Sequence, residues 1–187
     1  MLRSVLFLAL FAFSASASAQ GFDYNFLSVG YERVDLDAGG VDIDGDGFGV
    51  EGSFEISESF FLFGGYTAAE LESTVDVDFL SAGVGWHTPL SEQMDFVAGF
   101  SYENVDTDFG DEDGYGVNVG LRYQATDAVE LNGGINYIDY GNDGDDTAFG
   151  LRVLVGVTDN IDVGLSGEWG DDVSSYGISG RFYFGSM

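Results

Sequence analysis

The sequence predicts an all-β fold, and three features of the chain support this prediction. Apolar residues alternate with small or polar residues in one short segment after another, and a period of 2 places the two sets on opposite faces of a strand. Glycine occurs 29 times and proline once. Short connections with few charges alternate along the chain with connections rich in Asp, Glu and Gly. We therefore expect a closed antiparallel up-and-down β-barrel of about ten strands, or of eight if one of these hairpins does not form.

The first twenty residues have the layout of a secretory signal peptide. Arg3 is followed by an apolar run from Val5 to Phe13 and by the small residues Ala17, Ser18 and Ala19. This run is too short for a transmembrane helix, which needs about 20 apolar residues. We expect residues 1–19 to be removed on export and residues 20–187 to form one β-barrel domain.

The charge balance excludes one class of partner. The chain has 33 Asp and Glu against five Arg and no Lys, and a formal net charge of −28. Such a surface repels phosphates, so no nucleic acid partner is expected. Aromatic residues make up 16% of the chain, which is unlike a disordered acidic protein. Cysteine is absent, so no disulfide supports the fold.

The clearest hairpin lies between Phe79 and Tyr102. Each of its two strands has a bulky apolar face and a small or polar face, and a short polar turn joins the strands. The apolar set is Leu80, Ala82, Val84 and Trp86, then Phe96, Ala98, Phe100 and Tyr102, and the opposite set is Ser81, Gly83, Gly85 and His87, then Val97, Gly99, Ser101 and Glu103.

Eight further segments complete the set of ten. The third, which begins at Phe60, is apolar on both faces at its start, so its register stays open. The other seven present, in chain order, Leu27, Val29 and Tyr31; Phe48, Val50, Phe54 and Ile56; Tyr115, Val117, Val119, Leu121 and Tyr123; Val129, Leu131, Ile135 and Tyr137; Phe149, Leu151, Val153 and Val155; Ile161, Val163, Leu165 and Trp169; and Tyr176, Ile178, Phe182 and Phe184.

The apolar faces indicate a barrel that meets lipid. Three features favour a transmembrane barrel over a periplasmic or secreted β-barrel. They are the export signal, the aromatic residues at the ends of the apolar faces, and the position of three mature Arg residues on the small-polar face. Most acidic residues fall in the five longer connections, which would form one external rim. The residues expected to line the lumen are Glu32, Glu51, Glu103, Arg122, Glu130, Arg152, Glu168 and Arg181.

Two stretches resemble a known group of proteins. FFLFGGYTAAELESTVDVDFLSAGVGWHTPL and the closing YGISGRFYF are similar to the small outer-membrane β-barrel superfamily that includes OmpA, OmpX and opacity-type proteins. More narrowly, they resemble a plant-pathogen outer-membrane family once proposed to activate rice immunity. The resemblance implies a bacterial outer-membrane location and handling by the barrel-insertion machinery, and it carries over no catalytic residue. Barrels of this kind end on a terminal Phe, whereas Phe184 is followed here by Gly185, Ser186 and Met187.

The candidate sites for chemistry are few. His87 is the only histidine and lies on the small-polar face at the turn end of its strand, so a structural role is expected and no enzyme activity. Asp42, Asp44 and Asp46 match the first half of a calcium loop, but position 12 of that loop is Ser53 rather than a bidentate Glu. A solvated acidic turn and a weak divalent cation site both fit this segment. No cofactor is expected apart from weakly bound calcium or magnesium.

Two functions are compatible with the sequence. The first is a monomeric structural or surface-interaction barrel in the outer membrane, whose acidic external loops are bridged to lipopolysaccharide by divalent cations. The alternative is a narrow, weakly cation-selective pore for small solutes. A lumen filled by side chains would favour the structural role, and a water-filled lumen would favour the pore. The sequence provides only the identity of the inward residues.

Overall fold

The computed structural model describes residues 21–37, 42–71, 75–108, 110–141, 144–171 and 173–184. The expected signal peptide and the last three residues lie outside this part of the chain. Within it, no helix is both long enough and apolar enough to cross a membrane.

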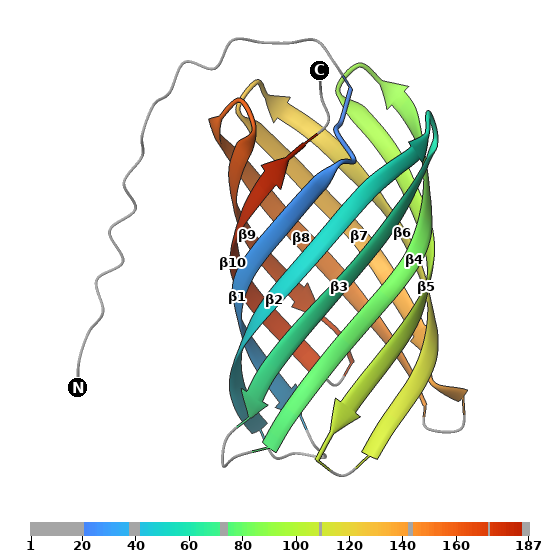
Figure 1. The fold of residues 1–187 in the computed structure, drawn as a ribbon, viewed down its shortest axis with the longest axis vertical. Helices are drawn as coiled ribbons and strands as arrows, with labels where there is room; N and C mark the ends of the chain where they lie inside the picture. The colour runs from blue at the N-terminus through green and yellow to red at the C-terminus, as the bar shows by residue number, and fades with distance from the viewer. Residues whose placement is uncertain are drawn as a thin grey trace, which may run out of the picture.

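Ten strands make up the described fold (Figure 1). They are β1 (Phe26–Asp37), β2 (Asp42–Ser57), β3 (Phe60–Leu71), β4 (Val75–Ser91), β5 (Met94–Thr107), β6 (Gly110–Thr126), β7 (Val129–Asp139), β8 (Asp145–Thr158), β9 (Ile161–Trp169) and β10 (Val173–Tyr183).

The sheet closes on itself. Each strand pairs with its neighbours in sequence, and β1 pairs with β10 antiparallel, from Phe26 opposite Tyr183 to Leu36 opposite Val173. Closure leaves no unpaired edge, which is the condition for a sheet to lie in hydrocarbon. The predicted closed antiparallel barrel is confirmed, with ten strands rather than eight.

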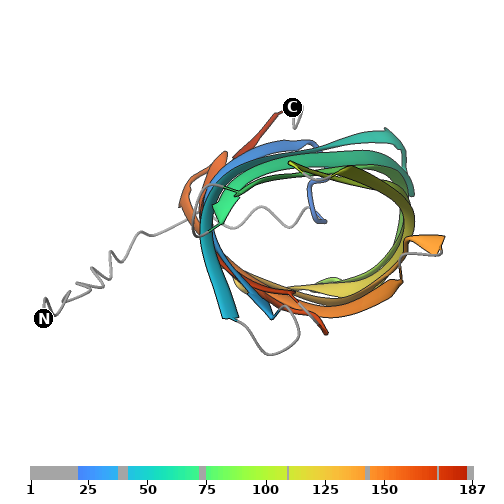
Figure 2. The same ribbon diagram turned by 90° about the horizontal axis from the view of Figure 1, so that it is seen from below.

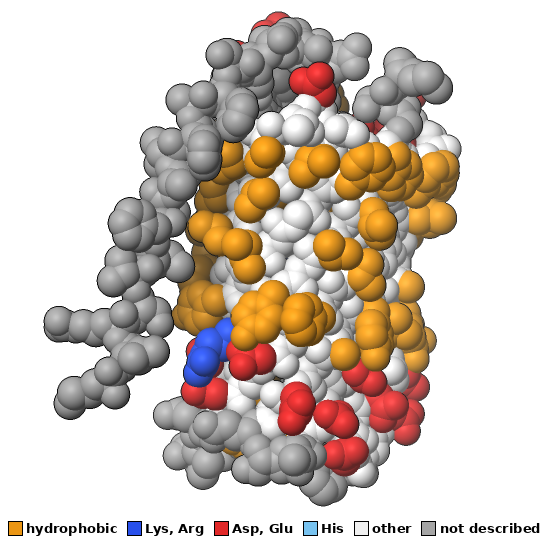
Figure 3. Space-filling model, turned by 60° about the vertical axis from the view of Figure 1, so that its left-hand side comes forward, with side chains coloured by type: hydrophobic (Ala, Val, Ile, Leu, Met, Phe, Trp, Pro, Cys, Tyr) orange, Lys and Arg blue, Asp and Glu red, His pale blue; other side chains and the backbone are white. Residues whose placement is uncertain are grey.

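The two faces of the wall differ as the alternation predicted. Outward apolar side chains such as Val29 and Phe48 are 58% and 72% exposed, whereas inward Ser28 is 2% exposed. Figure 3 shows apolar side chains spread across one face of the wall, with acidic side chains below them. An apolar band bordered by aromatic residues is the lipid-facing surface of an outer-membrane barrel.

The two ends of the barrel are built differently. At the turn end, four tight turns centred on residues 58–59, 92–93, 127–128 and 159–160 join the strands. A β-bulge lies beside each of these turns, between Glu55 and Ser57, Pro89 and Ser91, Gln124 and Thr126, and Gly156 and Thr158. The five acidic connections lie at the opposite, loop end. In outer-membrane barrels the short turns face the periplasm and the longer loops face outward.

The third strand adopts the register that the sequence left open. Leu62 and Tyr66 face outward, while Phe61 is buried and Phe63 also lines the lumen. The bulge before this strand sets the register, because one extra residue in the turn reverses which side chains face inward. The aromatic rings of Phe61 and Phe63 therefore enter the lumen from β3.

The barrel lumen as the candidate functional site

The lumen contains a cavity of about 610 Å³. It extends from Tyr24, Phe61 and Arg122 near the turn end to Glu32, Glu103 and Glu168 nearer the loop end. Many inward positions are glycine or serine, whose small side chains leave space inside the barrel. Figure 2 shows that the barrel cross-section is an ellipse. The ten-stranded wall thus encloses a polar space large enough for water and small solutes.

The structure places the eight charged residues assigned to the lumen on its inner wall. Glu32, Glu51, Glu103, Arg122, Arg152, Glu168 and Arg181 line the cavity, and Glu130 binds Arg122 beside it. The three arginines and their acidic partners lie between the middle of the lumen and the turn end, whereas Glu32, Glu103 and Glu168 lie nearer the loop end.

Two arginines share one carboxylate at mid-lumen. Arg152 donates to Glu51 through Nη1 at 2.5 Å and through Nη2 at 3.2 Å, and Arg181 Nη2 donates to Glu51 Oε1 at 3.0 Å. The Arg181 guanidinium also lies 3.9 Å from the centre of the Phe26 ring. Charged and bidentate hydrogen bonds of this kind fix side-chain geometry more firmly than neutral ones. This network joins β1, β2, β8 and β10 across the lumen.

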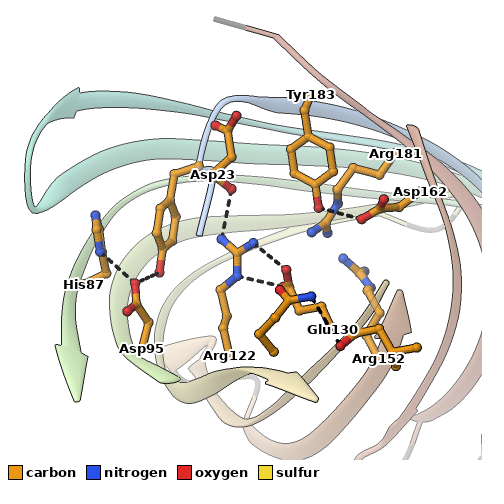
Figure 4. Close-up of polar contacts among 12 residues, drawn as sticks. Asp23, His87, Asp95, Arg122, Glu130, Arg152, Asp162, Arg181 and Tyr183 are labelled. Atoms are coloured by element: carbon orange, nitrogen blue, oxygen red, sulfur yellow. Dashed lines mark hydrogen bonds and ion pairs between the residues drawn. The ribbon is translucent and has the colours of Figure 1, made fainter. Parts of the chain in front are cut away.

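Arg122 and Glu130 form a buried ion pair between β6 and β7. Arg122 Nε donates to Glu130 Oε1 at 2.8 Å, and Nη2 donates to Oε2 at 3.1 Å. The remaining donor, Nη1, binds the backbone carbonyl oxygen of Asp23 at 3.1 Å. Arg122 thereby connects the barrel wall to the residues that precede β1 (Figure 4).

Residues 22–24 form a plug inside the turn end of the lumen. Tyr24 is 2% exposed, and its ring stacks on His87 at 3.9 Å and on Phe61 at 4.7 Å between centroids. The Arg122 guanidinium lies 4.5 Å from the centre of the same ring. In Figure 2 the segment before β1 turns into the barrel rather than continuing along the wall. Tyr24 therefore forms the floor of the cavity.

A hydrogen-bonded cluster holds the plug against the wall. The Tyr24 hydroxyl donates to Asp95 Oδ2 at 3.1 Å, and His87 Nδ1 lies 3.1 Å from the same oxygen. Burial is the main cause that raises the pKa of Tyr24 above its ordinary value; Asp95 adds to the increase and Arg122 opposes it. His87 thus lies where the alternation placed it, but it belongs to a cluster with Asp95 and Tyr24.

Three glutamates remain without an arginine partner. Among the described residues, no arginine forms an ion pair with Glu32, Glu103 or Glu168, although Ser101 Oγ donates to Glu103 Oε1 at 2.5 Å. Each of these carboxylates lies beside an inward glycine: Glu32 beside Gly177, Glu103 beside Gly116 and Glu168 beside Gly150. The side chains can therefore lie along the wall and leave the lumen axis clear.

The loop-end rim carries its acids on the outer surface as well. A row of exposed side chains crosses four neighbouring strands, with Arg33 opposite Asp46, Asp46 opposite Glu70 and Glu70 opposite Asp76. Like charges directly opposite each other on a sheet are destabilising. Just below this row, outward tyrosines bond to aspartates in three successive hairpins, through Tyr31 and Asp46, Tyr66 and Asp78, and Tyr102 and Asp113.

The candidate calcium residues are only partly described. Asp44 forms an ion pair with Arg33, and Asp46 accepts a hydrogen bond from Tyr31. The side chain of Asp42 lies outside the described residues. In the described part of the chain, no group of three acidic or histidine side chains is arranged to hold one metal ion.

Sequence reasoning missed the plug and one of its partners. Phe22, Asp23 and Tyr24 precede the first alternating segment and show no period of their own. Asp95 follows a polar turn, so its sequence context suggests a solvent-exposed acid. It nevertheless lies two residues before Val97 and therefore on the same inward face of the strand. The one sequence feature that could have indicated the plug is Tyr24, a large aromatic residue that lies outside every expected strand.

The lipid-facing band, the polar lumen and the two unlike ends define an outer-membrane β-barrel. The chain belongs to the family described as the outer membrane protein beta-barrel domain, whose model matches residues 5–156. No curated protein sequence matches the chain.

Several solved structures share the fold. An outer-membrane channel from Pseudomonas putida F1 is 9% identical, with a TM-score of 0.57 over 91% of this chain and 100% of that one. The translocator domain of the autotransporter NalP from Neisseria meningitidis is 12% identical, with a TM-score of 0.50 over 88% and 90%. Neisserial surface protein A is 15% identical, with a TM-score of 0.46 over 88% and 100%. At these identities the likeness to the first two structures shows the fold alone.

Proposed function

We propose that this protein is a monomeric, non-enzymatic surface barrel whose acidic rim is joined to lipopolysaccharide by divalent cations. Its mature form would comprise residues 20–187 after removal of a signal peptide over 1–19. The narrower resemblance to the plant-pathogen family belongs to this proposal, since it implies a surface role. Weakly bound calcium or magnesium would be the only ions required.

The row of Asp46, Glu70 and Asp76 carries the proposal. These exposed carboxylates lie on neighbouring strands at the loop-end edge of the lipid-facing band. Lipopolysaccharide phosphates lie at the same level of the outer leaflet and carry the same sign of charge. A divalent cation shared between a carboxylate and a phosphate relieves both repulsions, and calcium accepts six to eight oxygen ligands from mixed sources.

Lipopolysaccharide binding to the refolded protein tests this function. We expect binding in calcium that is reversed by a chelator, and a marked loss when Asp46, Glu70 and Asp76 are changed together to Asn, Gln and Asn. A matched control changes Glu32 and Glu168, two lumen carboxylates, to Gln and retains binding. Equal binding by the rim variant and the unchanged protein would refute the bridge.

A second candidate function is a narrow path for small cations. The observation that favours it is the set of three lumen glutamates, Glu32, Glu103 and Glu168, which have no arginine partner among the described residues. Unpaired carboxylates in a low-dielectric space are costly unless water or cations reach them. Anion-selective conductance of the refolded protein would exclude this path.

A further inference from the structure

The plug is attached to the barrel in a way that differs from every strand. In the described part of the chain, residues 21–24 form no backbone–backbone hydrogen bond with the wall, and the first such bond is made by the Asn25 carbonyl oxygen, which accepts from the Phe184 amide at 3.0 Å. The plug is held instead by side-chain contacts of Tyr24 and by Arg122, which donates to the Asp23 carbonyl oxygen. Asn25 anchors the segment to the wall, because its Oδ1 also accepts from the Glu55 amide at 3.0 Å. Residues 22–24 can therefore leave the lumen without breaking the sheet.

The position of Tyr24 makes this segment a closure. Its ring lines the cavity and is 2% exposed. It also lies between Phe61 of β3 and His87 of β4, and its hydroxyl reaches Asp95 of β5. Arg122 of β6 covers the ring from another side. Four consecutive strands therefore converge on one side chain, which fills this end of the lumen.

We propose that residues 22–24 are a removable plug, and that their release opens a continuous path for water and small cations through the barrel. The inference builds on the cation path, the second candidate function, and is independent of the lipopolysaccharide bridge. Segments held by few contacts open locally at a lower free-energy cost than the strands around them. The plug meets this condition, because its release breaks a small set of side-chain contacts and leaves all ten strands paired.

The inner wall supports a path once Tyr24 has moved. Arg122 lies on Glu130 of the adjacent strand, whereas Arg152 of β8 reaches Glu51 of β2 across part of the lumen and narrows the path above the plug. Beyond them the glutamates without arginine partners favour cations over anions. The path would therefore be narrow and cation-selective.

Thiol labelling tests the plug directly. The chain has no cysteine, so Ser53→Cys introduces a single thiol at a cavity-lining position that is 5% exposed. A positively charged, membrane-impermeant thiosulfonate is added to the folded protein in detergent, with and without Tyr24→Ala. We expect labelling to be several-fold faster with Tyr24→Ala. Access of the reagent from the loop end is the same in both proteins. An unchanged labelling rate would therefore contradict the proposal that Tyr24 closes the turn end.

Conductance in a planar bilayer tests the path. We expect the unchanged protein to be nearly silent and Tyr24→Ala, or a mature chain lacking residues 21–24, to show small cation-selective steps. Tyr140→Ala removes a ring of the same size between β7 and β8 and should stay silent. If Tyr24→Ala speeds labelling but gives no conductance, the cation path is refuted, while the assignment of Tyr24 as the closure still holds. Conductance that rises equally in Tyr140→Ala would overturn the assignment of the closure to residues 22–24.

Discussion

The Tyr24 hydroxyl donates a hydrogen bond to Asp95 across 71 positions of sequence, with 3.1 Å between the two oxygens. This bond joins a residue that precedes the first strand to the start of β5. The same carboxylate oxygen lies 3.1 Å from His87 Nδ1, so one acid positions both rings that close the turn end.

Charge on the lipid face should impair folding far more than charge in the lumen. Val119 is 44% exposed on the outer wall, and its neighbour Asn118 lines the cavity. Arginine near the bilayer midplane costs about 2–4 kcal/mol. We expect Val119→Arg to lower the free energy of unfolding by about this amount in lipid, and Asn118→Arg by much less, measured by urea titration in vesicles. The reverse order would mean that the two faces have been exchanged.

The buried pair of Arg122 and Glu130 should be expensive to break. Arg122 is 7% exposed, and removal of one partner from a buried pair typically costs about 3–5 kcal/mol because the other charge is left unpaired. We expect a loss of this size for Arg122→Ala. Exposed Arg33 provides the control, because surface ion pairs contribute only about 0–1 kcal/mol. The same urea titration applies, and equal losses for the two variants would contradict a buried pair.

Two strand glycines, Gly85 on the lumen face and Gly180 on the outer face, should tolerate alanine very differently. A Cβ added at Gly85 would lie 2.1 Å from the Phe61 ring, whereas a Cβ at Gly180 meets nothing within 4 Å. Overpacking of this kind typically costs about 1–3 kcal/mol. Gly85→Ala should therefore destabilise the barrel and disturb the Phe61 contact with Tyr24, and Gly180→Ala should be nearly neutral. Equal thermal midpoints for the two variants would show that Phe61 does not occupy the lumen.

Stability should fall in alkaline solution. Burial raises the pKa of Tyr140 to about 12, with Glu103, Asp146 and Glu112 adding to the increase, and burial also raises the pKa of Tyr24. A phenol whose pKa is higher in the folded than in the unfolded protein contributes stability that is complete below the unfolded value of 10.0 and is lost as the pH rises through the folded value. We expect the free energy of unfolding to decline from pH 10 toward about 12.

The double variant Tyr24→Phe and Tyr140→Phe separates this effect from general repulsion among the carboxylates. Its free energy of unfolding should depend less steeply on pH over the same range. An identical slope in the unchanged protein and the double variant would show that the two phenols do not titrate abnormally.

Much of the wall could be predicted from the sequence, because strand alternation is a local property. Trp86 and His87 are adjacent, and the period of 2 assigned them to opposite faces as the structure has them. The register of β3 could not be predicted, since it depends on a bulge of one residue between Glu55 and Ser57. The place of Tyr24 could not be predicted either. It results from packing against residues of β3, β4, β5 and β6, and no local pattern encodes that contact.

The two tryptophans test the central claim, which is that the apolar wall meets lipid around a polar lumen. The chain has only Trp86 and Trp169, both face outward, and they are 39% and 41% exposed. Trp86 lies toward the turn end, and Trp169 lies toward the loop end, where its indole N–H donates to the Tyr176 hydroxyl at 3.0 Å. Fluorescence of the protein refolded into vesicles of brominated phospholipid is the direct measurement. We predict strong quenching of both tryptophans in single-tryptophan variants that carry Phe at the other position. Fluorescence unaffected by brominated lipid would contradict a transmembrane barrel.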